Sequence, residues 1–164
     1  MDATKLARVV GELAKARGYR RRGLRLWKSG PELTLLIQLQ RSQWSRGVYV
    51  NYGVTPTAML IANAPPPLGN WGRTKRAETT PSPFHDAFCQ LVQDHDDQMD
   101  PAEMIEPFNW LLAHIDAEYG DTEAFRKAEL ARYGNTWGIL PDWANGVLNP
   151  SDYLPTTPRR PKEP

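Results

Sequence analysis

A cluster of aspartate and histidine residues near the middle of the chain is the first group that could do chemistry. Its members are His85, Asp86, Asp94, His95, Asp96, Asp97 and Asp100. Carboxylate and imidazole groups are suitable ligands for Mg²⁺, Mn²⁺ or Zn²⁺. Their spacing matches no known ligand pattern, however, and the consecutive Asp96 and Asp97 would point in different directions on a helix. We therefore expect a solvated acidic helix end, without a metal or any other cofactor.

A cysteine and a histidine could form a nucleophile and its base. The single cysteine, Cys89, follows His85 by one helical turn. Cys89 also lies beside Phe88 and Leu91, where a small core residue is expected. The sequence contains no serine–histidine–aspartate order, phosphate-binding glycine loop or paired-cysteine motif. The sequence therefore favours a protein without catalytic residues.

Basic residues dominate the first 28 positions, which contain nine Lys and Arg against two acidic residues. The centre of this run is a patch of four arginines: Arg20, Arg21, Arg22 and Arg25. With Tyr19 and Trp27 interleaved, such a patch could bind phosphate groups. Residues 85–125, however, carry eleven acidic residues and no Lys or Arg, and the net charge is only +1. We expect a solvated strand edge or attraction between the two halves; the alternatives are nucleic acid, which is disfavoured, and an acidic protein partner.

Two segments with alternating apolar residues predict strands that hide one face and show the other. Leu33, Leu35, Ile37 and Leu39 share one face, as do Val48, Val50, Tyr52 and Val54. Polar residues on the opposite face, together with one tryptophan in a turn and one in a loop, predict a candidate binding surface. Its members are Gln38, Gln40, Trp44, Tyr49, Asn51 and Trp71. Amide and aromatic side chains are common in binding surfaces. The alternative is that the loop over residues 63–82 covers this face, with Trp71 as its anchor.

Periodicity and capping signals predict the other elements. A first helix has the apolar stripe Leu6, Val9, Val10 and Leu13, with Asp2 or Thr4 as its cap and Gly18 near its end. Further strands are predicted over 22–28 and, as a possible fourth edge strand, over 55–62. Residues 84–93 favour a helix but also alternate like a strand. A capping box at Asp100–Glu103 and helices over 107–119 and from 121 onward complete the pattern.

These elements predict an α+β fold, in which an antiparallel meander of three to four strands has the N-terminal helix and the C-terminal helices packed on one face. Residues 1–134 are expected to form a single domain, and residues 135–164 a Pro-rich extension. No stretch has the roughly 18 apolar residues of a membrane span. One cysteine cannot form an internal disulfide, and the N-terminus resembles no signal core. We therefore expect a cytoplasmic protein without membrane contacts.

Three segments resemble a known bacterial family. A glycine and an aromatic residue precede basic residues and a glycine over 18–27; an apolar strand ends in Gln and a basic–Ser–x–Trp turn over 37–44; and an aromatic strand with Asn and Gly follows over 48–54. This pattern resembles the family called domain of unknown function 4304, most strongly over residues 5–54. Because that family has no settled activity, the resemblance implies a fold and no chemistry.

The function expected from these patterns is a non-enzymatic binding or regulatory module with a protein partner. Its more specific form is an immunity-type protein that neutralises a bacterial toxin, an expectation that rests on analogy between folds. The alternative is a nucleic-acid-associated or metal-dependent enzyme that uses the acidic and histidine cluster.

Overall fold

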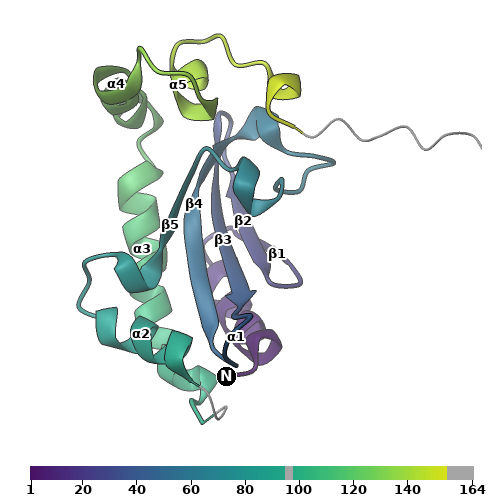
Figure 1. Cartoon of the computed structure of the whole chain (residues 1–164), viewed down its shortest axis with the longest axis vertical. Helices are drawn as coiled ribbons and strands as arrows, with labels where there is room; N and C mark the ends of the chain where they lie inside the picture. The colour runs from purple at the N-terminus through teal and green to yellow at the C-terminus, as the bar shows by residue number, and fades with distance from the viewer. Residues whose placement is uncertain (95–97, 155–164) are drawn as a thin grey trace, which may run out of the picture.

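The computed structural model describes residues 1–94 and 98–154, which form an antiparallel sheet with surrounding helices (Figure 1). The five strands are β1 (Arg20–Arg22), β2 (Arg25–Ser29), β3 (Leu33–Arg41), β4 (Val48–Pro56) and β5 (Arg73–Arg76), which neighbour one another in this order. The α-helices are α1 (Ala3–Lys15), α2 (His85–Gln93), α3 (Ile105–Tyr119), α4 (Thr122–Tyr133) and α5 (Ile139–Ala144). The predicted α+β fold with an antiparallel meander is confirmed, with five strands in place of three or four.

The alternation of side chains along the strands produces one apolar face. Leu26, Ile37 and Tyr52 are aligned on neighbouring strands, and each is at most 1 % exposed. Val50 and Val54 lie on the same face of β4 and are also buried. Removing each such side chain from water contributes about 1.5–3 kcal/mol to folding. The faces predicted for the second and third strands are therefore confirmed.

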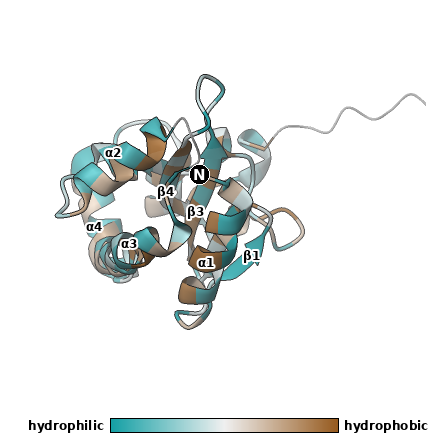
Figure 2. Ribbon diagram, turned by 90° about the horizontal axis from the view of Figure 1, so that it is seen from below, coloured by the Kyte–Doolittle hydropathy of each residue, from teal (hydrophilic) through white to brown (hydrophobic). Residues whose placement is uncertain are grey.

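Helices α1 and α3 lie side by side over this apolar face (Figure 2). Leu6 and Val10 of α1 and Phe108 and Ile115 of α3 are fully buried in the common core. In α1 these residues belong to the stripe predicted from the sequence, because their spacing brings them to one side of the helix. Within the described residues, each helix is too short or too polar to cross a lipid bilayer.

Carboxylates cap the helix starts where the sequence indicated. Asp2 accepts hydrogen bonds from the backbone N–H groups of two residues in α1, and Asp121 accepts one in α4. Asp100 and Glu103 form the predicted capping box at the 3₁₀ helix Pro101–Met104, which leads into α3. Residues 85–93 form α2, so the strand alternative for this segment is wrong.

The edges of the sheet differ from the sequence expectations. A turn at Gly23, with a φ of +60°, divides the predicted strand 22–28 and makes Arg20–Arg22 a separate edge strand. Residues 55–62 are not an edge strand, because β4 ends at Pro56 and the 3₁₀ helix Thr57–Met59 follows. The other edge is β5, which lies in the segment predicted to be a loop. Its sequence, RTKR, has no apolar alternation, and only pairing with β4 makes it a strand.

The domain extends further than residue 134. Leu140 and Trp143 of α5 are buried in the main core. The Arg126 guanidinium of α4 lies 4.4 Å from the centroid of a Trp143 ring. The predicted boundary is therefore too early, because the turn-rich composition after Gly134 concealed a short helix that packs on the domain.

Ion pairs connect the core side of the sheet to the acidic helices α3 and α4. Three come from strands, Lys28–Asp116, Lys75–Glu118 and Arg73–Glu129, and a fourth, Arg17–Asp116, comes from the turn that follows α1. The Glu129 side chain is only 3 % exposed, and a buried carboxylate without a cation would be strongly destabilising. The expected attraction between residues 1–28 and residues 85–125 is present in two of these pairs, Arg17–Asp116 and Lys28–Asp116.

Gly53 allows β5 to approach β4 closely. A Cβ at this position would lie 1.9 Å from the carbonyl oxygen of Arg73, a backbone atom that cannot swing aside. We expect Gly53→Ala to lower the free energy of unfolding by about 2–3 kcal/mol, because the strands must separate. Urea denaturation measures this change. The control is Gly69→Ala, whose added methyl meets nothing within 4 Å; equal stability of the two variants would contradict the prediction.

Candidate functional site

The second face of the sheet carries an unbroken row of polar residues, one on each strand. We call it the cross-sheet row, and its members in strand order are Arg22, Arg25, Gln38, Asn51 and Arg76. Each is the register partner of the next, so all five belong to one line across the sheet. Gln40 and Tyr49, which are paired with each other, lie on the same face on one side of this line.

A loop covers the apolar part of the same face. Trp27 and Leu36, on the other side of the cross-sheet row, pack against Trp71 and Leu68. Trp71 is only 6 % exposed, and its indole N–H donates to the carbonyl of Pro66 over 3.1 Å. Trp71 is therefore an anchor that holds the loop on the sheet, and its predicted place in an open binding surface is wrong.

Asn51 is also a structural member of this face. It is 1 % exposed, and its Nδ2 donates to Oε1 of Gln40 over 3.1 Å. The buried amide thus fixes the orientation of Gln40, which is half-buried, as are Gln38 and Tyr49. Of the four polar residues predicted on this face, three remain accessible to a partner, and Asn51 positions one of them.

Gln38 has an unusual hydrogen-bonding state. Its Oε1 is buried and has no hydrogen-bond partner among the described residues. Either orientation of the amide leaves one polar atom in this place. A buried polar group without a partner costs about 1–3 kcal/mol.

The predicted basic patch is divided between the two faces. Arg21 is paired with the buried Leu26, and its side chain lies against Gly11 of α1 on the core side. Arg20 and Arg22 alternate with it and belong to the second face. Arg22 and Arg25 form no ion pair with a carboxylate of the described residues. The positive charge of this face is therefore concentrated at the β1–β2 end.

Arg76 supplies positive charge at the β5 end of the row. Its guanidinium lies over the Tyr49 ring at 4.5 Å from the ring centroid. The nearest carboxylate oxygen with which it pairs, on Glu78, is 3.9 Å away, and the arginine side chain is 47 % exposed. Arg76 is absent from the predicted site residues, because no apolar pattern in the sequence identifies β5 as a strand.

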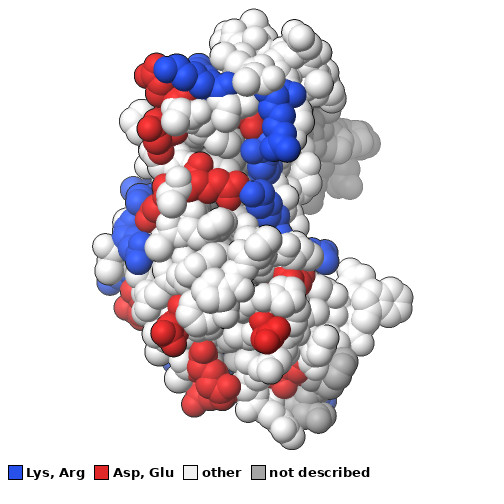
Figure 3. Space-filling view, turned by 90° about the vertical axis from the view of Figure 1, so that its left-hand side faces the viewer, with Lys and Arg blue, Asp and Glu red and all other residues white. Residues whose placement is uncertain are grey.

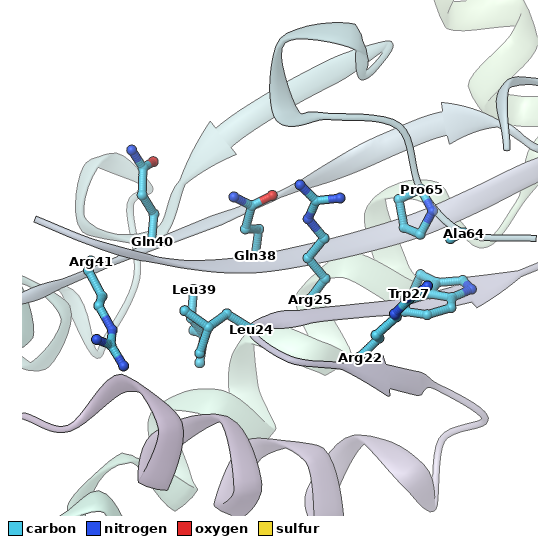
Figure 4. Close-up of a pocket in the computed structure, with 10 residues that line it drawn as sticks. All are labelled: Arg22, Leu24, Arg25, Trp27, Gln38, Leu39, Gln40, Arg41, Ala64 and Pro65. Atoms are coloured by element: carbon cyan, nitrogen blue, oxygen red, sulfur yellow. The ribbon is translucent and has the colours of Figure 1, made fainter. Parts of the chain in front are cut away.

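Two shallow hollows flank the centre of the row. The first, of 480 Å³, is lined by Arg22, Arg25, Gln38, Gln40 and Pro65, among others. Figure 4 shows the Arg25 and Gln38 side chains on one side of their strands and Arg41 directed to the other side, toward α1. The second hollow, of 600 Å³, is lined by Asn51, Leu68 and Arg76, among others. Because Gln38 is paired with Asn51, the hollows adjoin along the row.

Trp44 lies at the tip of the turn between β3 and β4 and is 91 % exposed. The hydroxyl of Ser42 accepts hydrogen bonds from the backbone N–H groups of Trp44 and Ser45, each over 3.1 Å. The hydroxyl of Ser45 donates to the carbonyl of Val92 in α2 over 3.2 Å. The turn is thus fastened to the domain while its indole is open to solvent, a typical state for a contact residue of an interface.

The acidic and histidine cluster does not assemble into a site within the described residues, which hold no group of three or more potential metal ligands. Asp94 accepts backbone hydrogen bonds from Gln98 and Met99, and Asp100 caps a 3₁₀ helix. His95, Asp96 and Asp97 lie outside the described residues. On the helical side of the molecule, the acidic side chains form small separate groups (Figure 3).

Cys89 and His85 approach each other on α2, with 3.5 Å between Sγ and Nε2. The described residues supply no hydrogen-bond partner for the other ring nitrogen of His85. Without such a partner nothing orients the imidazole as a base. The pair is the consequence of two residues one turn apart on a helix.

Comparison with protein-family models, with curated proteins and with solved structures finds no match. The resemblance to domain of unknown function 4304 therefore stays a prediction.

Asp94 makes the acidic segment part of the fold. Burial by itself raises the pKa of this carboxyl, but hydrogen bonds from the amino group of Met1 and two backbone N–H groups outweigh it and lower the pKa below its ordinary value. A lowered pKa stabilises the fold above the unfolded pKa of about 3.9, and this contribution is lost as the pH falls through the folded pKa.

We expect Asp94→Asn to lower the free energy of unfolding at pH 7 by about 1–3 kcal/mol. The difference from the wild type should shrink as the pH falls from 5 toward 3. Urea denaturation at several pH values measures both effects. Asp86→Asn, at an exposed position of α2, is the control. A difference for Asp94→Asn that is constant with pH would contradict this account.

Proposed function

We propose that this chain is a non-enzymatic binding module that captures an acidic segment of another protein on the second face of its sheet. The observation that carries the proposal is the state of Arg22 and Arg25, which line the first hollow without a carboxylate partner among the described residues. On the opposite face, by contrast, three cations of the sheet, Lys28, Arg73 and Lys75, have carboxylate partners on the helices. Unpaired guanidinium groups in a hollow favour carboxylates, which they can bind through two parallel hydrogen bonds.

Three further features support a protein partner. The amides of Gln38 and Gln40 offer donors and acceptors for a polypeptide backbone. Trp44 adds rigid apolar area in the exposed turn that joins β3 to β4. The remainder of the chain is acidic enough to bring the net charge to +1, which disfavours the phosphate backbone of nucleic acid. An immunity-type protein that neutralises a toxin is one specific form of this proposal and stays a prediction.

Charge reversal in the hollow tests the proposal. The probe is a fluorescent dodecapeptide of glutamate, and fluorescence anisotropy at 50 mM and 150 mM salt measures its binding. We expect Arg25→Glu to weaken binding at least tenfold, because an attraction becomes a repulsion. The control is Arg8→Glu, which makes the same charge change at an exposed position of α1 on the opposite side. Equal weakening by both variants, or tighter binding of a single-stranded oligonucleotide than of the peptide, would overturn the proposal.

Trp44 should contribute to capture of the natural partner and not to folding. Because the residue is 91 % exposed, we expect Trp44→Ala to leave the melting temperature within about 1 °C of the wild-type value. Affinity for the partner protein should fall by more than about 1 kcal/mol, as is typical of a tryptophan in an interface. Calorimetric titration measures the affinity. An unchanged affinity would exclude the turn from the binding surface.

A further inference from the structure

We infer that the captured segment crosses the strands along the cross-sheet row and is recognised by two separated acidic positions, one bound at Arg25 and one at Arg76. This inference rests on the proposed function and adds the orientation and the acidic spacing of the partner segment. It starts from the register, which places positive residues toward both ends of the row and amides between them.

Arg25 and Arg76 are held in different ways, and each of them lines a hollow. Arg25 lines the first hollow beside Gln38. Arg76 lines the second hollow, and its stacking on Tyr49 restricts the guanidinium without consuming its hydrogen-bond donors. Such a preorganised arginine loses little conformational freedom when it binds a carboxylate.

The centre of the row offers no cation to a carboxylate. Gln38 and Asn51, which lie between Arg25 and Arg76 in the register, are neutral amides. A carboxylate placed there would lose its hydration without gaining an ion pair. The residues between the two acidic positions are therefore uncharged, and their backbone contacts the amides of Gln38 and Gln40.

The strand spacing sets the distance between the acidic positions. Arg25 on β2 and Arg76 on β5 are three strands apart, which is about 14 Å at the usual separation of neighbouring strands. An extended peptide rises about 3.3 Å per residue, so that residues four apart are separated by about 13 Å and point to the same side. The recognised pattern is thus an acidic residue, three uncharged residues and a second acidic residue.

Peptides of identical composition test the spacing. Three dodecapeptides each contain four glutamates among serines. In the first peptide the glutamates form two pairs, and the two members of each pair are four residues apart. In the second peptide the four glutamates are contiguous, and in the third they form two pairs whose members are eight residues apart. We expect the first peptide to bind five- to tenfold more tightly than the other two, as measured by fluorescence anisotropy at 50 mM salt. Arg76→Gln should reduce its affinity to that of the contiguous peptide, whereas Arg76→Lys, which retains the charge, should keep most of the preference. Arg8→Gln is the control for net charge.

The outcomes separate this inference from the proposed function. Equal affinity of the three peptides, with binding still weakened by Arg25→Glu, would overturn the spacing and leave capture by this face intact. A preference for spacing four that survives Arg76→Gln would overturn the role of the β5 end. Loss of the preference in Arg76→Gln with an unchanged melting temperature would support the inference, because the fold is then intact.

Discussion

The pairing of β3 with β4 is the interaction on which the rest of the structure depends. Nine residue pairs, from Leu33 with Pro56 to Arg41 with Val48, hold these central strands in one register. Because side chains alternate along both strands, this register places leucine, isoleucine, valine and Tyr52 on one face and amides on the other. A shift by one residue would expose the core and bury the glutamines. The core and the candidate site are thus consequences of the same pairing.

The second face is divided because its composition changes along the strands. Near Trp27 and Leu36 it is apolar, and the loop that carries Trp71 covers it. Beyond the cross-sheet row it is polar, and covering it with apolar residues would leave amides and guanidinium groups without partners. The loop therefore ends its coverage beside the row, and the edge of the covered region forms one wall of each hollow through Pro65 and Leu68.

The cations of the sheet have different partners on its two faces. Those on the core side must lie beside α3 and α4, where Asp116, Glu118 and Glu129 neutralise them. These helices contain no carboxylate that reaches Arg22 or Arg25 within the described residues. A net charge near zero consequently conceals a local excess of positive charge, because the compensating acidic residues lie on the other side of the sheet and on the helices.

Local information was sufficient for the elements with a strong pattern. Period-two alternation identified β3 and β4 and their faces, and capping residues such as Asp2 and Asp121 located the helix starts, because each signal acts within a few residues. Long-range contacts decided the rest. β5 exists only through pairing with β4, Trp71 is buried only because its loop returns to the sheet, and α5 is ordered by packing on the core. The cross-sheet row unites residues 22 and 76 only after five strands are aligned, and no spacing in the sequence encodes that alignment.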